Sequence, residues 1–281
     1  MSIALTIGYS PCPNDTFIFY ALVRGKVRVP GIEFDERLED VETLNLMALN
    51  GTLDITKTSF HALGHLRQQY ALLQSGGALG RGCGPLIVAK PGRTIADLKT
   101  GPIAIPGKLT TANLLLRIFD PSIENVIIMP FDRIMEAISR EDMTAGIIIH
   151  ESRFTYQLYN LEKMLDLGEW WEQFTGLPIP LGGILGKRSL RRDILLRVES
   201  GIRESLQYAR THPQEVMEYC SKHSQELNHD IMYKHIDLYV NDFSFDLGSE
   251  GIAAVYRLFH EAEIRGIFPH SNTPLLAEDE Q

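Results

Sequence analysis

The stretch Leu177-Pro-Ile-Pro-Leu-Gly-Gly-Ile-Leu-Gly186 divides the chain into two parts with different patterns. Before it, short β-rich runs alternate with amphipathic helical runs. After Ser189 the pattern is almost wholly helical. We therefore interpret residues 177–186 as a crossover, by which the chain returns to a first lobe that it had left earlier.

The first part of the chain favours a mostly parallel sheet covered by helices, because its strands and helices alternate. The expected strands are residues 4–9, 32–38, 54–59 and 71–75, and the expected helices are residues 15–23, 41–50 and 60–69. A glycine-rich stretch, residues 76–84, then runs into a strand at residues 85–89. Because no helix follows these glycines, they are not a dinucleotide-binding fingerprint, and we expect a flexible loop near a lobe crossing.

A second α/β series begins after Lys90-Pro-Gly-Arg93. Its expected strands are residues 103–105, 125–129 and 145–149, and its expected helices are residues 111–119, 131–139 and 170–174. The helical tail is expected at residues 191–211, 213–223, 230–240 and 250–265. The sequence thus predicts an α/β protein whose first lobe holds residues 1–90 and 186–281, whose second lobe holds residues 91–185, and whose ligand cleft lies between them.

Length, charge and cysteine usage narrow the class of protein. A chain of 281 residues exceeds the usual size of one domain, and 44% apolar with 22% charged residues is typical of a globular protein. The net charge of −9 argues against a nucleic-acid partner, although backbone N–H groups can still bind an anion. The apolar run at residues 17–23 is too short to span a membrane. Cys12, Cys83 and Cys220 lack any disulfide or zinc-site spacing, which favours the reducing cytoplasm.

Three polar segments follow expected strands and precede expected helices, where α/β proteins bind ligands. They are Ser10-Pro-Cys-Pro-Asn-Asp-Thr16, Thr56-Lys-Thr-Ser59 and Pro106-Gly-Lys-Leu-Thr-Thr111. Each offers hydroxyl groups or helix N–H groups to an anion, and the first two could equally serve only to cap their helices. The last segment lacks the spacing of a P-loop, so a nucleotide phosphate is not expected there.

His150 lies at the end of a fully apolar strand, and Glu151, Ser152 and Arg153 follow it. Since an ordinary histidine has a pKa near 6.5, His150 at a cleft could exchange protons, although a purely structural histidine is the commoner case. His61 and His65 lack the glutamate of a zinc-binding H-E-x-x-H motif, so no metal site is expected. The tail histidines are expected at the surface: His212, His223, His229, His235, His260 and His270.

Long strings of the sequence resemble the 1,4-dihydroxy-6-naphthoate synthase family, which acts in the futalosine route to menaquinone. The strings are Ser-Pro-Cys-Pro-Asn-Asp-Thr-Phe-Ile-Phe-Tyr20, Leu-Glu-Asp-Val-Glu-Thr-Leu-Asn45, Ser-Gly-Gly-Ala-Leu-Gly-Arg-Gly82 and Gly-Ile-Ile-Ile-His-Glu-Ser-Arg-Phe-Thr-Tyr156. The resemblance runs over nearly the whole chain, to about Pro274.

The resemblance implies a type II periplasmic-binding-protein-like fold with two interlobe crossings. It also implies a lyase that converts cyclic dehypoxanthine futalosine, a small anionic substrate, to 1,4-dihydroxy-6-naphthoate and dihydroxyacetone without metal or organic cofactor. By the match to the family's motifs, His150 is expected to be the catalytic base. The same matches imply that the substrate contacts Lys57, Thr58, Ser59, Thr110 and Thr111, with Asp15 and Asn45 bordering the cleft.

Two alternatives share the expected architecture, since fold does not fix function. One is a non-catalytic type II solute-binding protein for a small anion, and the other is the related chorismate dehydratase. The string around His150 favours the naphthoate synthase. The oligomeric state stays open, with a homodimer as one alternative, because an isologous interface leaves no readable pattern here.

Overall fold

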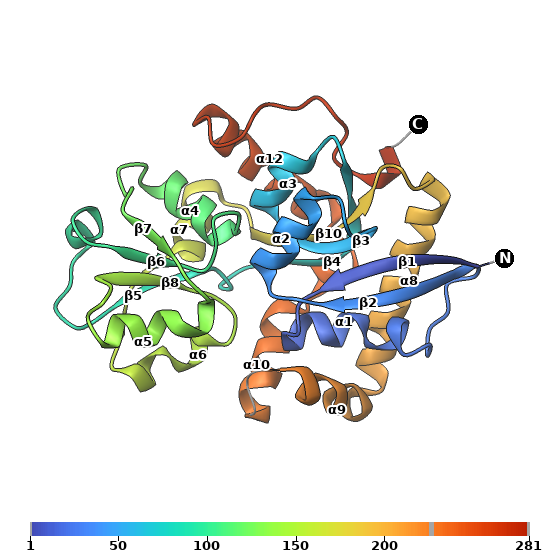
Figure 1. Cartoon of the computed structure of the whole chain (residues 1–281), viewed down its shortest axis with the longest axis horizontal. Coiled ribbons are helices and arrows are strands. Elements are labelled where there is room, and N and C mark those ends of the chain that lie inside the picture. The colour runs from blue at the N-terminus through green and yellow to red at the C-terminus, as the bar shows by residue number, and fades with distance from the viewer. Residues whose placement is uncertain (1, 225–227, 280–281) are drawn as a thin grey trace.

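A computed structural model describes residues 2–224 and 228–279, which form two lobes built around separate sheets (Figure 1). The first lobe holds a five-stranded sheet in the order β2-β1-β3-β10-β4. Its strands are β1 (Ile3–Tyr9), β2 (Ile32–Leu38), β3 (Ile55–Ser59), β4 (Tyr70–Gly80) and β10 (Ile179–Lys187). The second lobe holds a five-stranded sheet in the order β7-β6-β8-β5-β9. Its strands are β5 (Leu86–Ala89), β6 (Ile103–Ile105), β7 (Val126–Ile128), β8 (Ala145–Ile148) and β9 (Glu162–Asp166).

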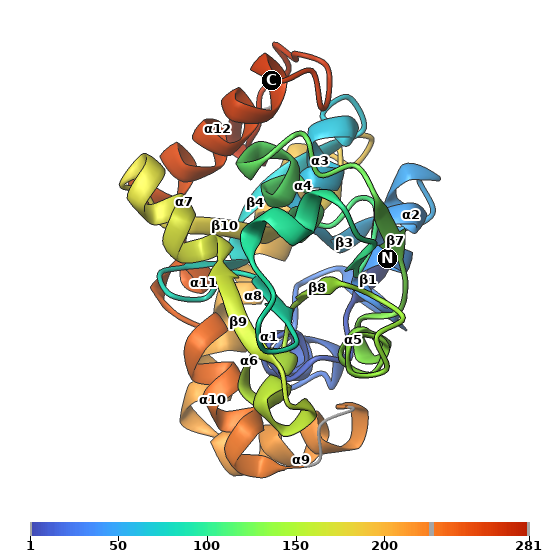
Figure 2. The ribbon, with the colours of Figure 1, turned by 90° about the vertical axis from the view of Figure 1, so that its left-hand side faces the viewer.

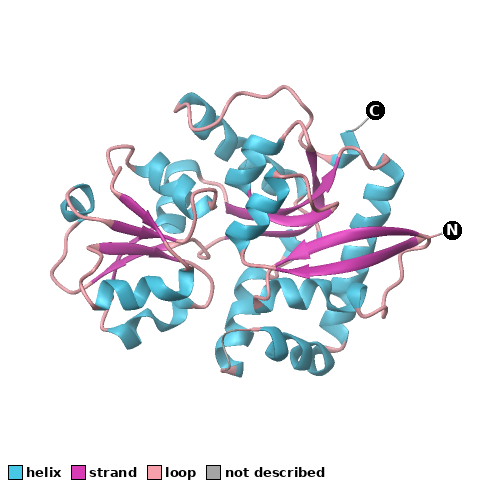
Figure 3. Cartoon of the chain, viewed as in Figure 1, coloured by secondary structure: helices cyan, strands magenta, loops and turns pink. Residues whose placement is uncertain are grey.

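Helices pack around both sheets (Figure 3). Those before the second lobe are α1 (Pro13–Val23), α2 (Val41–Leu49) and α3 (Phe60–Leu66). The second lobe contributes α4 (Thr111–Phe119), α5 (Ile134–Ser139), α6 (Ser152–Thr155) and α7 (Leu167–Thr175), with short 3-10 turns at Ile95–Lys99, Phe131–Arg133 and Tyr156–Tyr159. The tail comprises α8 (Arg192–Thr211), α9 (Pro213–His223), α10 (His229–Tyr239), α11 (Asp242–Phe245), α12 (Gly248–Ile264) and a 3-10 turn at Ala277–Asp279.

One strand in each sheet runs against the others. In the first lobe β10 is antiparallel to both of its neighbours, and in the second lobe β5 is antiparallel to both of its neighbours. These are the strands that the chain enters directly after each crossing between lobes. A strand that begins at the interlobe edge runs away from it, whereas β1, β3, β6 and β8 end there. Because all the other strands of each sheet run in one direction, the expectation of a mostly parallel sheet is confirmed.

The crossings come earlier in the chain than the sequence suggested. Strand β5 belongs to the second sheet, so the predicted boundary after residue 90 is several residues late, and β10 already belongs to the first sheet before residue 186. The turn signal at Lys90-Pro-Gly-Arg93 marks the far end of β5 and not a lobe boundary. The expected loop at residues 76–84 is wrong for residues 76–80, which extend the buried strand β4, whereas residues 81–84 do lie outside the strands.

The extension of β4 depends on pairing with β10, whose residues Ile179 and Pro180 lie opposite Gly80 and Leu79. This pairing satisfies backbone groups that would otherwise be buried without partners. Gly76 adopts φ +79°, a left-handed conformation that glycine tolerates without strain. The glycines therefore allow an irregular, buried strand and do not create a mobile loop.

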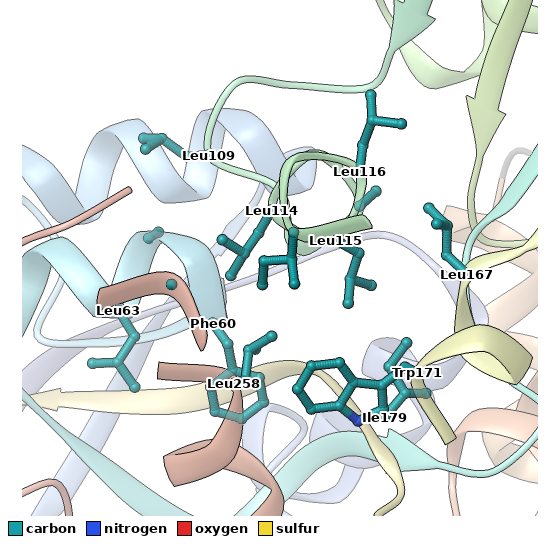
Figure 4. Close-up of a cluster of buried hydrophobic side chains, with 14 of the residues drawn as sticks. Phe60, Leu63, Leu109, Leu114, Leu115, Leu116, Leu167, Trp171, Ile179 and Leu258 are labelled. Atoms are coloured by element: carbon teal, nitrogen blue, oxygen red, sulfur yellow. The ribbon is translucent and has the colours of Figure 1, made fainter. Parts of the chain in front are cut away.

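A continuous apolar core joins the two lobes on one side of the molecule (Figure 4). Phe60 and Leu258, from the first lobe and the tail, share a cluster with Leu115 of α4 and Trp171 of α7. The Trp171 side chain is fully buried, and its Nε1–H donates to the carbonyl oxygen of Pro178 at 3.1 Å. Burying one such large side chain contributes about 1.5–3 kcal/mol, so this shared cluster stabilises the contact between the lobes.

The helical tail packs on the first lobe, as the sequence predicted. Figure 2 shows it extending from α9 and α10 at one end to α12 at the other. Helices α8, α9 and α10 all contact α1, and their apolar faces share its core cluster. Within residues 2–224 and 228–279, no helix has the length and apolar character needed to cross a bilayer.

Candidate functional site

A cavity lies between the lobes, at the edge where β1, β3 and β8 end. It encloses about 710 Å³, open space at its mouth included, which is in the usual range for a small-molecule site. The first lobe lines it with the turn after β1 and the end of β3, and the second with the start of α4 and the residues after β8. Helix α10 of the tail completes the lining. Every residue that the sequence predicted for the site borders this cavity except Asn45.

Asp15 lies in the first turn of α1, on the first-lobe wall of the cavity. Its Oδ2 accepts hydrogen bonds from the Ser10 amide at 3.2 Å and the Ser10 hydroxyl at 2.7 Å, and its Oδ1 accepts one from Asn14 Nδ2 at 2.9 Å. The side chain is almost fully buried, and the N-terminal end of α1 favours its negative charge. Asp15 is therefore held by the protein itself and shapes the wall.

Lys57 on β3 neutralises Asp15. Its Nζ lies 3.1 Å from Asp15 Oδ1 and donates to the carbonyl oxygen of Gly76 at 2.9 Å. The two charged side chains are only 7% and 3% exposed. Because an ammonium has three N–H donors, these two contacts leave one for a ligand in the cavity that Lys57 lines.

Thr58 and Ser59 complete the β3 wall. The Thr58 hydroxyl is buried and makes no hydrogen bond, so a ligand beside it could supply the missing partner. Asn45 of α2 holds Ser59: its Oδ1 accepts from the Ser59 amide at 2.9 Å, and its Nδ2 donates to the Ser59 hydroxyl at 3.2 Å. The structure therefore gives Asn45 contacts that position Ser59 and places it behind the cavity wall.

Thr110 and Thr111 stand at the start of α4, on the second-lobe wall. The Thr110 hydroxyl caps the helix by accepting from the Asn113 amide at 3.3 Å, and it donates to the Gly107 carbonyl oxygen at 2.9 Å. The Thr111 hydroxyl donates to the Leu181 carbonyl oxygen of β10 at 2.5 Å. Since the first N–H groups of a helix have no partner within it, this end of α4 brings partial positive charge to the cavity.

Two side chains of the first lobe reach across to this start of α4. Glu42 of α2 accepts from the Leu109 amide at 3.0 Å, and His61 of α3 lies with Nδ1 3.2 Å from the Thr110 carbonyl oxygen, to which it donates. Burial is the main cause that lowers the His61 pKa to about 4, so the ring is neutral at pH 7. These contacts hold the two cavity walls together.

His150 follows β8 and borders the cavity. Its φ of +55° lies in the left-handed region, which is uncommon for residues other than glycine and is frequent at functional sites. Its ring meets Phe131 edge-on at 5.1 Å between centroids. Burial lowers the pKa of His150 below 6.5, against the opposing effects of Glu151 and Asp15. The ring is therefore in its neutral, proton-accepting form at pH 7.

The structure overturns the expectation that His235 is a surface residue. His235 lies on α10, is fully buried and borders the cavity. Its ring stacks on that of His150, with centroids 6.1 Å apart and planes inclined by 15°. Its Nε2 donates to Asn14 Oδ1 at 2.9 Å, and burial holds its pKa well below 6.5.

The spacing of the apolar residues in α10 could have identified His235 as a buried residue. Met232, Ile236 and Tyr239 form the buried stripe of this helix, and His235 lies on the same stripe. Apolar residues at intervals of three and four mark the face that a helix buries. A histidine on that face is therefore expected to be buried, and a buried polar group is a candidate site residue even when its helix belongs to the tail.

Glu151 lies next to His150 in the chain but faces a different environment. Its Oε2 is buried without a hydrogen-bond partner, and it lies 3.9 Å from His235 Nδ1, which also has none. A second cavity of about 570 Å³, again including open space, is bordered by Glu151, His150 and Phe131. His150 thus stands between the two cavities. Arg153 is turned away, because it pairs with Asp166 at 2.7 Å.

One group in the described part of the chain has ligand atoms close enough for a metal ion. Cys12, His150 and Glu151 each place one such atom within 4.8 Å of the others. Burial, reinforced by Glu151, raises the pKa of the Cys12 thiol well above its usual range. A site without metal or organic cofactor stays the prediction made from the sequence.

Comparison with known proteins identifies relatives over almost the full chain. Residues 5–263 match a family described as menaquinone biosynthesis. A 1,4-dihydroxy-6-naphtoate synthase of Thermus thermophilus is 48% identical over 273 residues, covering 97% of this chain and 98% of the relative. A protein of the same name from Streptomyces coelicolor is 43% identical over 279 residues, with the same coverage. Both are named as synthases, which supports an enzyme.

Solved structures of other proteins have folds similar to that of this chain. A crystal structure of a protein from Archaeoglobus fulgidus matches with a TM-score of 0.89 and 37% identity, covering 94% of this chain and 98% of that one. The alkanesulfonate-binding protein of Xanthomonas axonopodis pv. citri, bound to MOPS, matches with a TM-score of 0.72 and 15% identity, covering 99% and 98%. The latter confirms the periplasmic-binding-protein-like fold and nothing more. On the sequence matches, this chain belongs to the menaquinone biosynthesis family, alongside the 1,4-dihydroxy-6-naphtoate synthases.

Proposed function

We propose that this protein is a lyase that converts cyclic dehypoxanthine futalosine to 1,4-dihydroxy-6-naphthoate and dihydroxyacetone, with His150 as the general base. The observation that carries the proposal is the placement of His150. It borders the interlobe cavity in a neutral form, because burial lowers its pKa below 6.5. A positioned base whose proton-accepting form predominates at the working pH is what such a step requires.

The cavity walls support a small anionic substrate. The start of α4 carries the positive end of a helix dipole, and Thr110 and Thr111 border the cavity there. We assign this wall to the carboxylate of the substrate. On the opposite wall, the remaining N–H donor of Lys57 and the unpartnered hydroxyl of Thr58 suit oxygen atoms of the same molecule.

The proposed step begins when His150 takes a proton from a carbon next to an acidifying carbonyl group of the substrate. The electrons of that bond form a new ring double bond, and the carbon–carbon bond to the three-carbon fragment breaks. Formation of an aromatic ring contributes much of the driving force. The residues of this chain contribute position and proton transfer, and a placed base typically accelerates such a step by about 10²–10⁴-fold.

The cytoplasm stays the proposed location. Cys12, Cys83 and Cys220 are all free and buried, and widely spaced free thiols suit a reducing compartment. The expectation that no nucleic acid or membrane is a partner rests on the charge and composition of the sequence. Binding of the anionic substrate is the partner interaction that the cavity supports.

A solute-binding function is the second candidate, because the fold is shared with an alkanesulfonate-binding protein at a TM-score of 0.72. The two functions differ in one measurable respect. A solute-binding protein binds the cyclic substrate and releases it unchanged, whereas the lyase releases naphthoate and dihydroxyacetone.

The test compares the wild type with His150→Ala on the cyclic substrate, with product release and ligand binding both measured. We expect the wild type to turn over, and the variant to bind with similar affinity but react about 10²–10⁴-fold more slowly. A variant that keeps near-normal turnover would show that His150 is structural. If the wild type binds without reacting, the solute-binding function replaces the proposal. A parallel incubation with the substrate of chorismate dehydratase separates that enzyme from both.

A further inference from the structure

Two buried acceptor atoms face each other beside His150 without a hydrogen bond. They are Oε2 of Glu151 and Nδ1 of His235, which lie 3.9 Å apart on side chains only 12% and 1% exposed. Nearly all buried polar atoms in folded proteins have a partner, so two orphaned atoms at one place call for a physical explanation.

The hydrogen-bond network fixes which proton is missing. Asn14 Nδ2 donates to Asp15, so Asn14 Oδ1 faces His235 Nε2, at 2.9 Å. A carbonyl oxygen only accepts, and Nε2 of His235 must therefore carry the ring proton. The other nitrogen, Nδ1, is then a bare acceptor that faces a carboxylate oxygen. A single additional proton would give the pair one donor and one acceptor, and a side-chain shift that closes the 3.9 Å gap to hydrogen-bond distance would then satisfy both orphaned atoms.

We propose that Glu151 and His235 share one proton, and that Glu151 delivers it to the three-carbon fragment as this fragment leaves. This inference rests on the proposed lyase function. Splitting the substrate into two products leaves the total number of protons unchanged, so the proton that His150 removes must be matched by one that the fragment receives. In this scheme Glu151 supplies the second proton, and His150 only accepts the first.

The atoms and electrons of the step balance without any co-reactant. The C–H electrons form the ring double bond, and the electrons of the broken carbon–carbon bond leave with the fragment, which takes the proton from Glu151. The proton on His150 then passes to the Glu151–His235 pair and restores the starting state. His150 and Glu151 are adjacent in the chain, and the His150 ring stacks on His235.

The two members of the pair have different roles. Glu151 borders the second cavity together with His150, so we place the departing fragment in that cavity, beside the Glu151 carboxyl group. Glu151 is therefore the catalytic residue of the pair. His235 is fully buried and anchored by Asn14, so it is a positioning residue that keeps the proton on the Glu151 side chain.

The test separates proton removal from cleavage by running the reaction in deuterium oxide. In Glu151→Gln and His235→Gln, we expect release of naphthoate to slow by about 10²-fold or more, while the recovered substrate gains deuterium at the carbon that His150 deprotonates. Glutamine at position 235 can still donate to Asn14, but it offers no acceptor at the place of Nδ1. His235→Asn is the matched control, because its amide oxygen replaces Nδ1 and keeps the contact with Glu151. Its ratio of exchange to cleavage should stay near that of the wild type.

Three results would overturn the inference. Glu151→Gln could cleave at a rate near that of the wild type, or it could lose exchange and cleavage together, as a structural defect would. His235→Asn could also uncouple the two steps as strongly as His235→Gln does. Failure of the lyase function itself looks different, since the wild type would then release no naphthoate. His150→Ala, which should neither exchange nor cleave, sets the background for every comparison.

Discussion

Two pairs of ionisable side chains beside the cavity, Asp15–Lys57 and Glu151–His235, differ in how fully their polar atoms are bonded. On the first-lobe side, Asp15 and Lys57 bond to each other, and both also bond to neighbouring groups. On the side of α10, Glu151 and His235 each carry a buried atom without a partner. No side chain of either pair is more than 12% exposed, so burial alone does not separate the pairs.

This difference in pairing indicates which residues hold the substrate and which take part in proton transfer. Paired charges cannot change protonation state without breaking their contacts, so the Asp15–Lys57 side is suited to hold a fixed shape. Unpaired acceptors next to a neutral His150 can gain or lose a proton at little structural cost. Unsatisfied buried groups in a native structure often mark catalytic roles, and here they lie beside the proposed base.

The largest predicted effect comes from removing Lys57. Lys57→Met keeps the apolar stem but leaves Asp15 as a buried carboxylate without its ion-pair partner. Loss of one member of a buried pair typically destabilises a protein by about 3–5 kcal/mol. We expect the free energy of unfolding, measured by denaturant titration, to fall by this amount.

The matched control for this variant is Lys187→Met. Lys187 pairs with Asp54 at 3.2 Å, but both side chains are about a quarter exposed. A pair of this exposure contributes roughly 1 kcal/mol or less. If the two variants lost similar stability, the Asp15–Lys57 pair would not be the rigid element that the comparison requires.

The second prediction concerns His61, which ties the paired side to the start of α4. Burial lowers its pKa in the folded protein to about 4, against 6.5 in the unfolded chain. As the pH falls below 6.5, the unfolded state therefore gains protons first, and stability falls by about 1.4 kcal/mol per pH unit until about pH 4. Between pH 7 and pH 5, we therefore expect the free energy of unfolding of His61→Asn to fall by about 2 kcal/mol less than that of the wild type.

Unfolding free energies measured from pH 7 to pH 4.5 check this prediction. Asparagine at position 61 can still donate to Thr110 but does not titrate, so only the pH dependence should change. His270 serves as the control, because hydrogen bonding to Glu263 raises its pKa and it is protonated in both states below pH 6. His270→Asn should therefore keep the steep acid slope of the wild type. Equal slopes for His61→Asn and the wild type would contradict the prediction.

Strands and helices were predicted correctly from the sequence where the residues within each element carry a clear pattern. Strand β2 and helices α4 and α9 coincide with the sequence prediction, because alternation, caps and a proline at the helix start mark them. Strand β9, with charged residues at both ends, was missed for lack of such a pattern. The extension of β4 through residues 76–80 was missed because it depends on pairing with β10, far away in the chain.

The site was predictable only in part for a similar reason. Strand ends and helix starts directed attention to Lys57, Thr110 and His150, each beside its own local signal. His235 comes from the tail, and only the packing of α10 against α1 brings it to the cavity. The ion pair between Asp15 and Lys57 likewise depends on β1 and β3 being neighbours in the sheet. Which polar groups remain unpaired is a property of the assembled cavity.

The smallest predicted effect concerns two threonines of a single strand. Thr58 and Thr56 are both buried on β3, but the Thr58 hydroxyl has no partner, whereas the Thr56 hydroxyl donates to the Lys57 carbonyl oxygen at 3.0 Å. Valine matches the shape of threonine without the hydroxyl. Because an unsatisfied buried hydroxyl costs free energy, Thr58→Val should leave stability unchanged or raise it by up to about 1 kcal/mol, while Thr56→Val should lower it by about 1 kcal/mol.

In a binding titration, Thr58→Val should nevertheless lower the affinity for the substrate, because the ligand is the missing hydrogen-bond partner of the Thr58 hydroxyl. Unaltered affinity would mean that the unpaired hydroxyl has no part in binding, and that the first-lobe side acts only through its paired groups.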